Sequence, residues 1–291
     1  MKTFANRVAV ITGAASGFGR EFARIAAARG MKLALADIEP AALDAVAAEL
    51  RATGAEVAPF IVDVGNAEAM DGFADAVFAR FGTIHLLFNN AGVGLGGLIW
   101  EHTVADWQWV LNVNLWGVIH GIRCFVPRMI EGGDEGHIVN TASVAGLLSA
   151  QTMGAYNVSK HGVVTLSETL FQDLRITGAR LGVTVLCPAF VDTGIKDAAR
   201  NRPADLASPT PPTASQLMAE AQTRKAVISG RTSAAEVAAM TFAAIEAERF
   251  YCLTHKKILG AVELRLQDIL HDRSPSDPFA QKKEVAFTAP V

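Results

Sequence analysis

Short apolar runs alternate with longer helical patterns along most of the chain, and this alternation constrains the fold most. Apolar, often β-branched runs bounded by turn residues indicate buried strands. We expect strands at 8–11, 32–37, 57–63, 84–89, 137–141, 182–187 and 250–254, and helices at about 17–29, 40–53, 66–80, 106–130, 155–177 and 233–247. Repeated strand–helix units build a parallel sheet covered by helices on both faces. The pattern therefore predicts an α/β fold with a doubly wound sheet.

Two segments interrupt the alternation. Residues 194–230 contain the proline-bearing stretches 201–203 and 209–212 between an expected strand and an expected helix. A long insertion after the carboxyl end of a strand is usually functional, so we expect a substrate lid here. The tail at 272–291 combines three prolines with mixed charge, and we expect it to be mobile or docked on a neighbour. The continuous rhythm elsewhere favours one domain over 1–291.

Composition excludes several classes of function. The formal net charge of −3 gives no reason to expect nucleic acid or an anionic membrane as a partner. The N-terminal residues lack the long apolar stretch of a signal peptide and no apolar run reaches about 18 residues, so we expect neither a signal peptide nor a membrane span. Cys124, Cys187 and Cys252 lie far apart, without a C-x-x-C pair, which favours a reducing compartment and hence the cytoplasm. No ligand spacing indicates a metal.

A glycine-rich turn joins the first expected strand to the first helix. Gly13, Gly17 and Gly19 are spaced G-x-x-x-G-x-G. Glycine lets the backbone adopt positive φ and approach a pyrophosphate without a Cβ clash. The following helix offers free N–H groups and the positive end of its dipole. We expect these glycines, with Ser16 and Phe18, to bind a dinucleotide, the alternative being a tight turn without a ligand.

Acidic residues end the second and third expected strands. Asp37, followed by Ile38, stands where dinucleotide folds use an acid to bind the adenosine ribose. Its charge would repel a 2′-phosphate, and no Arg or Lys follows within five residues. We therefore expect NAD as the cofactor and disfavour NADP, although a solvated acid at a turn would look the same. Asp63 and Val64 are expected to hold the adenine.

A tyrosine and a lysine lie one turn apart in the expected helix 155–177. This spacing puts Tyr156 and Lys160 on the same helix face. The reference pKa of a phenol, about 10, is too high for ready proton transfer near neutrality. A nearby ammonium lowers the pKa of the phenol, so the pair suits acid–base catalysis between hydroxyl and carbonyl. An exposed helix face is the alternative interpretation.

Two further polar residues suit the same chemistry. Ser143 follows the strand at 137–141, and its hydroxyl would stabilise negative charge developing on a substrate oxygen. Ser149 competes for this role but lies deeper in the loop. Asn114, on the long helix at 106–130, would hold a water that passes protons to Lys160. A satisfied polar group within a helix explains Asn114 equally well.

Taken together, these motifs resemble the short-chain dehydrogenase/reductase family over roughly 1–255. The resemblance rests on Thr12-Gly13-x3-Gly17-x-Gly19, Asn89-Asn90-Ala91-Gly92, the set Asn114, Ser143, Tyr156 and Lys160, and Pro188-x-x-Val191-x-Thr193. It implies a Rossmann-type sheet of about seven parallel strands and a homotetramer or homodimer. It further implies that Tyr156 is the catalytic acid/base and that Ser143 positions the substrate. The cofactor contacts that it implies are Asn90, Ala91, Gly92, Tyr156, Lys160, Pro188, Val191 and Thr193.

The expected substrate pocket has apolar walls. We expect its lining to include Leu95, Leu147, Met153, Phe190 and Ile195. Clefts lined in this way bind bulky apolar or aromatic ligands through a few polar anchors. The lid and the longer C-terminus also resemble the C-alpha dehydrogenase branch of the family, which oxidises benzylic alcohols of lignin-derived aryl ethers.

The sequence thus favours an NAD-dependent oxidoreductase that moves a hydride between the nicotinamide and a secondary alcohol or ketone. The first alternative is an NADPH-dependent 3-ketoacyl-type reductase, against which Asp37 argues. The second is a non-catalytic dinucleotide-binding scaffold, because fold alone does not fix function. A scaffold has no reason to keep Asn114, Ser143, Tyr156 and Lys160 together.

Overall fold

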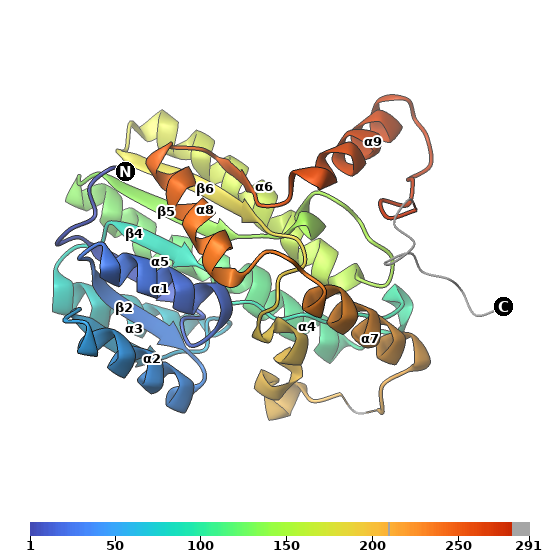
Figure 1. The fold of residues 1–291 in the computed structure, drawn as a ribbon, viewed down its shortest axis with the longest axis horizontal. Helices are drawn as coiled ribbons and strands as arrows, with labels where there is room; N and C mark the ends of the chain where they lie inside the picture. The colour runs from blue at the N-terminus through green and yellow to red at the C-terminus, as the bar shows by residue number, and fades with distance from the viewer. Residues whose placement is uncertain (209, 281–291) are drawn as a thin grey trace.

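The fold is described from a computed structural model that covers residues 1–208 and 210–280. In this part of the chain seven parallel strands form one sheet in the order β3-β2-β1-β4-β5-β6-β7 (Figure 1). The strands are β1 (Val8–Thr12), β2 (Lys32–Asp37), β3 (Val57–Ile61), β4 (Leu86–Asn89), β5 (Gly136–Thr141), β6 (Leu181–Cys187) and β7 (Tyr251–Leu253). The predicted doubly wound α/β fold is confirmed.

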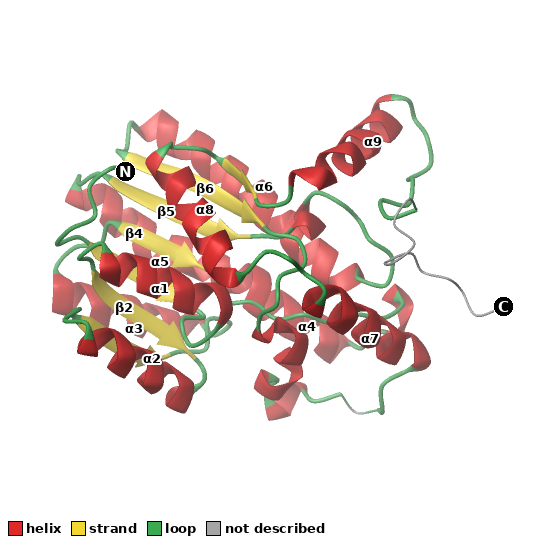
Figure 2. Ribbon diagram, viewed as in Figure 1, coloured by secondary structure: helices red, strands yellow, loops and turns green. Residues whose placement is uncertain are grey.

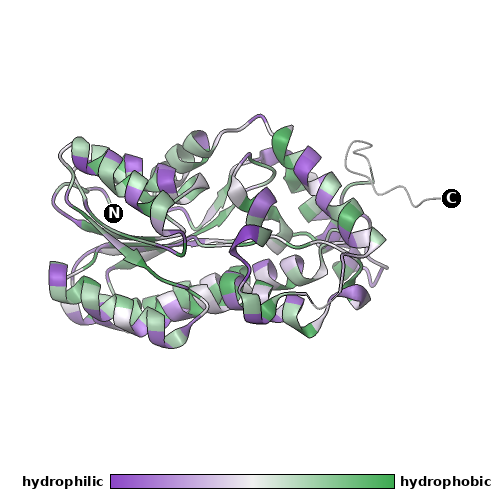
Figure 3. Cartoon of the chain, turned by 90° about the horizontal axis from the view of Figure 1, so that it is seen from below, coloured by the Kyte–Doolittle hydropathy of each residue, from purple (hydrophilic) through white to green (hydrophobic). Residues whose placement is uncertain are grey.

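Helices cover both faces of the sheet, as Figures 2 and 3 show. One face carries α1 (Gly17–Ala28), α2 (Pro40–Ala52) and α8 (Ala234–Glu246), and the other carries α3 (Ala67–Phe81), α5 (Gly117–Gly132) and α6 (Gly154–Thr177). Alternate residues of each strand serve the two layers: Ala9 and Ile11 pack into the first core, Val8 and Val10 into the second. Both faces are therefore buried, and the strands read as continuous apolar runs.

The single helix expected at 106–130 is interrupted. It consists of α4 (Val104–Leu111), a π-helical turn η2 (Asn112–Trp116) and α5. Such π-turns are frequent at functional sites, and this one contains Asn114. The sequence pattern did not reveal the interruption because the π-turn keeps the chain helical on either side.

The insertion at 194–230 has more regular structure than a loop. It forms the 3-10 helices η4 (Gly194–Asn201) and η5 (Ala204–Leu206), followed by α7 (Ala214–Ile228). Thr213 caps α7 in a capping box with Gln216.

The sequence did not predict α9 (Leu259–Leu270), a helix after β7 whose side chains are mostly exposed. Of the expected tail, 281–291 lies outside the described residues. None of the described helices is long and apolar enough to cross a membrane.

Candidate active site

A cavity of about 490 Å³ opens at the carboxyl ends of the strands. It borders the point where the strand order reverses between β1 and β4, which is where ligands bind in doubly wound sheets. The lining includes these residues singled out from the sequence: Gly13, Ser16, Gly17, Phe18, Asp37, Ile38, Asp63, Val64, Asn90, Ala91, Gly92, Leu95, Ser143, Met153, Tyr156, Lys160, Pro188, Phe190, Val191, Thr193 and Ile195.

Three of the expected site residues do not line this cavity. Gly19 is packed against the glycine-rich turn, and a Cβ there would lie 2.0 Å from the Gly13 carbonyl oxygen. Asn114 is fully buried behind the cavity wall. Leu147 was wrongly assigned to the pocket: it packs against the core cluster of α5 and α6, whereas the adjacent Leu148 lines the cavity. Ser149, the competitor of Ser143, is exposed.

The carboxylate of Asp37 braces the glycine-rich turn. Its Oδ2 accepts a hydrogen bond from the Ala15 N–H at 2.8 Å, and its Oδ1 accepts one from the Glu39 N–H at 3.1 Å. Gly13 and Gly17 in the same turn have φ of +66° and +52°, which glycine adopts without strain. Burial raises the pKa of Asp37, and these backbone hydrogen bonds oppose the rise. Asp37 therefore shapes the turn as well as facing the cavity.

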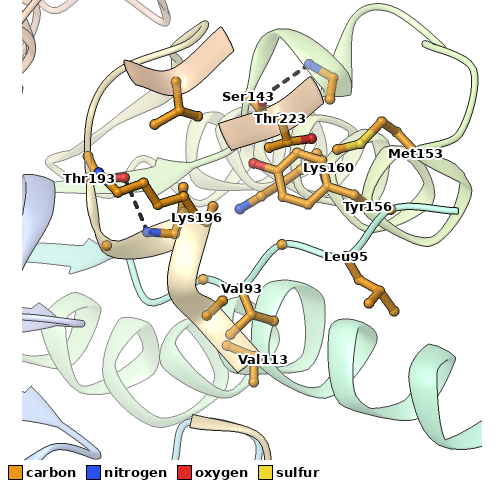
Figure 4. A pocket seen from close by; sticks show the side chains of 18 of the residues that line it. Val93, Leu95, Val113, Ser143, Met153, Tyr156, Lys160, Thr193, Lys196 and Thr223 are labelled. Atoms are coloured by element: carbon orange, nitrogen blue, oxygen red, sulfur yellow. Dashed lines mark hydrogen bonds between the residues drawn. The ribbon is translucent and has the colours of Figure 1, made fainter. Parts of the chain in front are cut away.

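The catalytic candidates lie together at the other end of the cavity (Figure 4). The Lys160 ammonium donates to the Thr141 carbonyl oxygen at 2.9 Å and lies 5.7 Å from the centroid of the Tyr156 ring. Ser143 Oγ accepts from the Ala145 N–H at 3.1 Å. Side chains from the loop after β5 and from α6 thus lie together beside the carboxyl end of β5.

The electrostatics of this group differ from the sequence expectation. Burial lowers the pKa of Lys160 to about 8. Burial also raises the pKa of Tyr156, and hydrogen bonding to Ser143 opposes this rise. We expected Lys160 to lower the pKa of Tyr156. In this structure that expectation is wrong, because desolvation of the phenolate outweighs an ammonium that is directed at Thr141.

Asn114 has no free amide hydrogen for a water. Its Oδ1 accepts from the Val93 N–H at 2.8 Å, and its Nδ2 donates to the Val93 carbonyl oxygen at 2.9 Å and to Ser159 Oγ at 3.1 Å. Both N–H donors of the amide are therefore used. The side chain ties the loop after β4 to α6, as the satisfied-polar-group interpretation expects, and the water-holding role stays a prediction.

Ion pairs anchor the segment 194–206 over the cavity. Glu39, just after β2, accepts from Arg200 at 2.7 Å and from Asn201 at 2.8 Å. Arg202 forms a second pair with Asp106 of α4 at 2.7 Å. The sequence patterns did not predict either anchor, because each joins residues far apart in the chain. Arg200 also places a positive charge in the Asp37 region, whereas the residues directly after β2 contain no Arg or Lys.

We expect the two anchors to differ in strength. Asp106 is 1% exposed, so Arg202→Ala would leave a buried carboxylate without its cation and lower the free energy of unfolding by about 2–4 kcal/mol. Arg200→Ala removes an exposed pair and should cost at most about 1 kcal/mol. Urea denaturation of both variants measures the difference. Equal losses would contradict the assignment of Arg202 as the main anchor.

Comparison with known proteins identifies the family. A model of the short chain dehydrogenase family matches residues 7–204. The chain therefore belongs to this family, as its motifs predicted. It is an oxidoreductase of a family that binds nicotinamide cofactors.

Two of the similar proteins match over nearly the whole chain, and a third matches over 70% of it. The crystal structure of a short chain dehydrogenase/reductase from Burkholderia phymatum in complex with NAD has a TM-score of 0.94 at 54% identity, covering 96% of this chain and 99% of that one. A "CLA biosynthesis dehydrogenase/reductase" of Lactiplantibacillus plantarum is 36% identical over 94% of this chain and 97% of its own length. The "C alpha-dehydrogenase" of a Sphingobium strain is 40% identical over 70% of this chain and 67% of its own. The last of these agrees with the resemblance to the C-alpha dehydrogenase branch.

Proposed function

We propose that the protein is an NAD-preferring dehydrogenase or ketone reductase for bulky apolar or aromatic secondary alcohols. The observation that supports this most strongly is the content of one cavity. Ser143, Tyr156 and Lys160 line one part of it, and Asp37 and the start of α1 line another. Groups suited to proton transfer and groups suited to nucleotide recognition therefore share a single binding site.

The nucleotide end of the cavity fits a dinucleotide. Ser16, the N-cap of α1, makes no capping hydrogen bond with its side chain, so the first N–H groups of the helix remain available to a pyrophosphate. Gly13 and Gly17 keep side chains away from that approach. Asp37 supplies a carboxylate for ribose hydroxyls. By family resemblance, Val191 and Thr193 would hold the carboxamide.

The reaction would use two side chains at the substrate oxygen and a third at the nicotinamide ribose. The nicotinamide, when bound, supplies the hydride acceptor or donor. Tyr156 would take the hydroxyl proton during oxidation and return it during reduction. Ser143, whose Oγ is oriented by the Ala145 N–H, would donate to the same oxygen as negative charge develops. Lys160, whose ammonium is held by the Thr141 carbonyl oxygen at 2.9 Å, would bind the nicotinamide ribose, as the family resemblance implies.

We expect Asp37→Asn to weaken the preference for NAD. The asparagine amide oxygen can still accept from the Ala15 N–H, so the turn keeps its brace while the negative charge is lost. Without that charge a 2′-phosphate meets less repulsion, and the ratio of kcat/KM with NAD to that with NADP should fall roughly 10- to 100-fold. Asp44→Asn removes the same charge from the exposed face of α2 and is the matched control. An unchanged ratio in Asp37→Asn would rule out Asp37 as the discriminator.

The substrate end of the cavity favours apolar groups. Leu95, Met153, Phe190 and Ile195 line it, together with Gly94 and Gly96. A pocket with such walls favours substrates with a large apolar surface, and its few polar groups fix the orientation of the substrate. The similarity to the Sphingobium C alpha-dehydrogenase adds to the resemblance to the C-alpha dehydrogenase branch, and that resemblance supports the same choice of substrate.

Initial rates with NAD and NADP in parallel test the proposal. The alcohols should run from 2-butanol to 1-(2-naphthyl)ethanol, with the absorbance of the reduced cofactor as the readout. We expect turnover with NAD on the bulky members. Turnover only with NADP and acyl-type ketones would favour the 3-ketoacyl-type reductase, and NAD binding without any turnover would favour a scaffold.

A further inference from the structure

The described end of the chain returns to the cavity after α9. Within 271–280 only Pro278 and Phe279 are partly buried, and the other residues are exposed. Phe279 lines the cavity. Its ring centroid lies 6.5 Å from that of Phe190, with the planes tilted by 44°, within the range of aromatic pairs. A residue far beyond the family's motifs thus contributes to the wall of the proposed substrate site.

Specific hydrogen bonds shape this returning segment. Asp268 of α9 is 4% exposed. Its Oδ2 accepts from the Ser276 N–H at 2.9 Å, and its Oδ1 pairs with Arg273 at 3.2 Å. Asp277 Oδ1 accepts from the Phe279 N–H at 2.9 Å. The turn that carries Phe279 is therefore held to α9, and Phe279 reaches the cavity as part of an ordered arm, defined here as 271–280.

Phe190, the partner of Phe279, is itself fixed near the reacting groups. It lies between Pro188, whose carbonyl oxygen accepts a hydrogen bond from Ser143 Oγ at 3.4 Å, and Val191, which lines the same cavity. Its own carbonyl oxygen would be 2.5 Å from a Cβ at Gly230, so the backbone there is tightly packed. Phe190 therefore lines the same cavity as Ser143 and Tyr156 from a tightly packed backbone.

We propose that Phe279 and Phe190 form a continuous aromatic wall and that the arm thereby selects alcohols bearing an aryl group. This inference rests on the proposed function and names its substrate class. Planar rings gain favourable edge and face contacts with such a wall, which a saturated ring of similar size does not. Asp268 is the positioning residue, because it holds the turn from which Phe279 projects.

Ratios of kcat/KM within each variant test the wall, because they do not depend on the amount of folded enzyme. The probes are 1-(2-naphthyl)ethanol, 1-cyclohexylethanol and 2-butanol, each with NAD. In Phe279→Ala we expect the naphthyl-to-butanol ratio to fall about tenfold. In Phe279→Leu, which keeps apolar bulk, the naphthyl-to-cyclohexyl ratio should fall while the cyclohexyl-to-butanol ratio is kept.

Two further variants separate the arm from general effects. Asp268→Asn should reproduce part of the Phe279→Ala change, since it weakens the hold on Ser276 and Arg273. Leu270→Ala, at an exposed position of α9 away from the cavity, should leave all ratios unchanged. Wild-type ratios retained in Phe279→Ala would overturn the aromatic wall while leaving the proposed function intact. Failure of wild-type protein to oxidise any of the alcohols would instead overturn the proposed function.

Discussion

Tyr156→Phe is expected to lower kcat by about 10²- to 10⁴-fold, the usual contribution of a positioned acid or base. The substitution removes only the hydroxyl that would exchange a proton with the substrate oxygen. The ring remains beside Lys160, and no residue at the nucleotide end of the cavity changes. Binding of NADH, followed by its fluorescence, should therefore stay nearly the same.

The chain contains a matched control for this variant. Of its two tyrosines, the second, Tyr251, lies in β7 and donates to Glu168 at 2.6 Å outside the cavity. Tyr251→Phe removes the same atom and should leave kcat within about twofold, as expected for a group outside the reaction. If Tyr156→Phe kept most of the wild-type kcat, Tyr156 could not be the acid/base.

Lys160→Met is expected to abolish most activity and at the same time to stabilise the fold. Lys160 is 2% exposed, and its pKa drops from 10.5 to about 8 because burial disfavours the charged form. At neutral pH this burial costs about 3 kcal/mol. Losing the hydrogen bond to the Thr141 carbonyl oxygen destabilises the variant by about 1 kcal/mol, which offsets part of this gain. The free energy of unfolding should thus rise by about 2 kcal/mol.

The gain should depend on pH in a definite direction. Below pH 8 the lysine is charged in both folded and unfolded chains, so the cost of burial is complete. Between about 8 and 10.5 the folded protein releases the proton while the unfolded chain retains it, and wild-type stability rises relative to the variant. Urea denaturation should show a smaller difference in the free energy of unfolding between Lys160→Met and wild type at pH 9.5 than at pH 7. Lys257→Met, at an exposed position, is the control. A Lys160→Met protein less stable than wild type at pH 7 would contradict this description.

Local sequence signals were sufficient to predict the fold. Apolar runs such as 8–11 and 32–37 mark strands buried on both faces, and Gly13 and Gly17 occur where the backbone needs positive φ. These features depend on neighbours in the chain. For the same reason, Ser143, Tyr156 and Lys160 could be singled out from motifs on consecutive elements.

Features set by long-range contacts could not be predicted in this way. The pairing of Glu39 with Arg200 joins residues 161 positions apart, and no spacing rule connects them. Asn114 looked available for a water because its partner, the Val93 backbone, is brought to it only by folding. Leu147 and Leu148 are alike in sequence, and only the 3-10 turn η3 (Val144–Gly146) decides which one faces the cavity. Phe279 lies beyond every recognised motif.

Isotope transfer tests the central claim most directly. The wild-type protein would be incubated with NAD and 1-(2-naphthyl)ethanol carrying deuterium on its carbinol carbon, and the reduced cofactor would be analysed by mass spectrometry. If the alcohol gives its hydride to the nicotinamide, the reduced cofactor carries the deuterium and the corresponding ketone accumulates in equal amount. Reduced cofactor without deuterium, or no reduction of NAD by any bulky secondary alcohol, would contradict the proposed function.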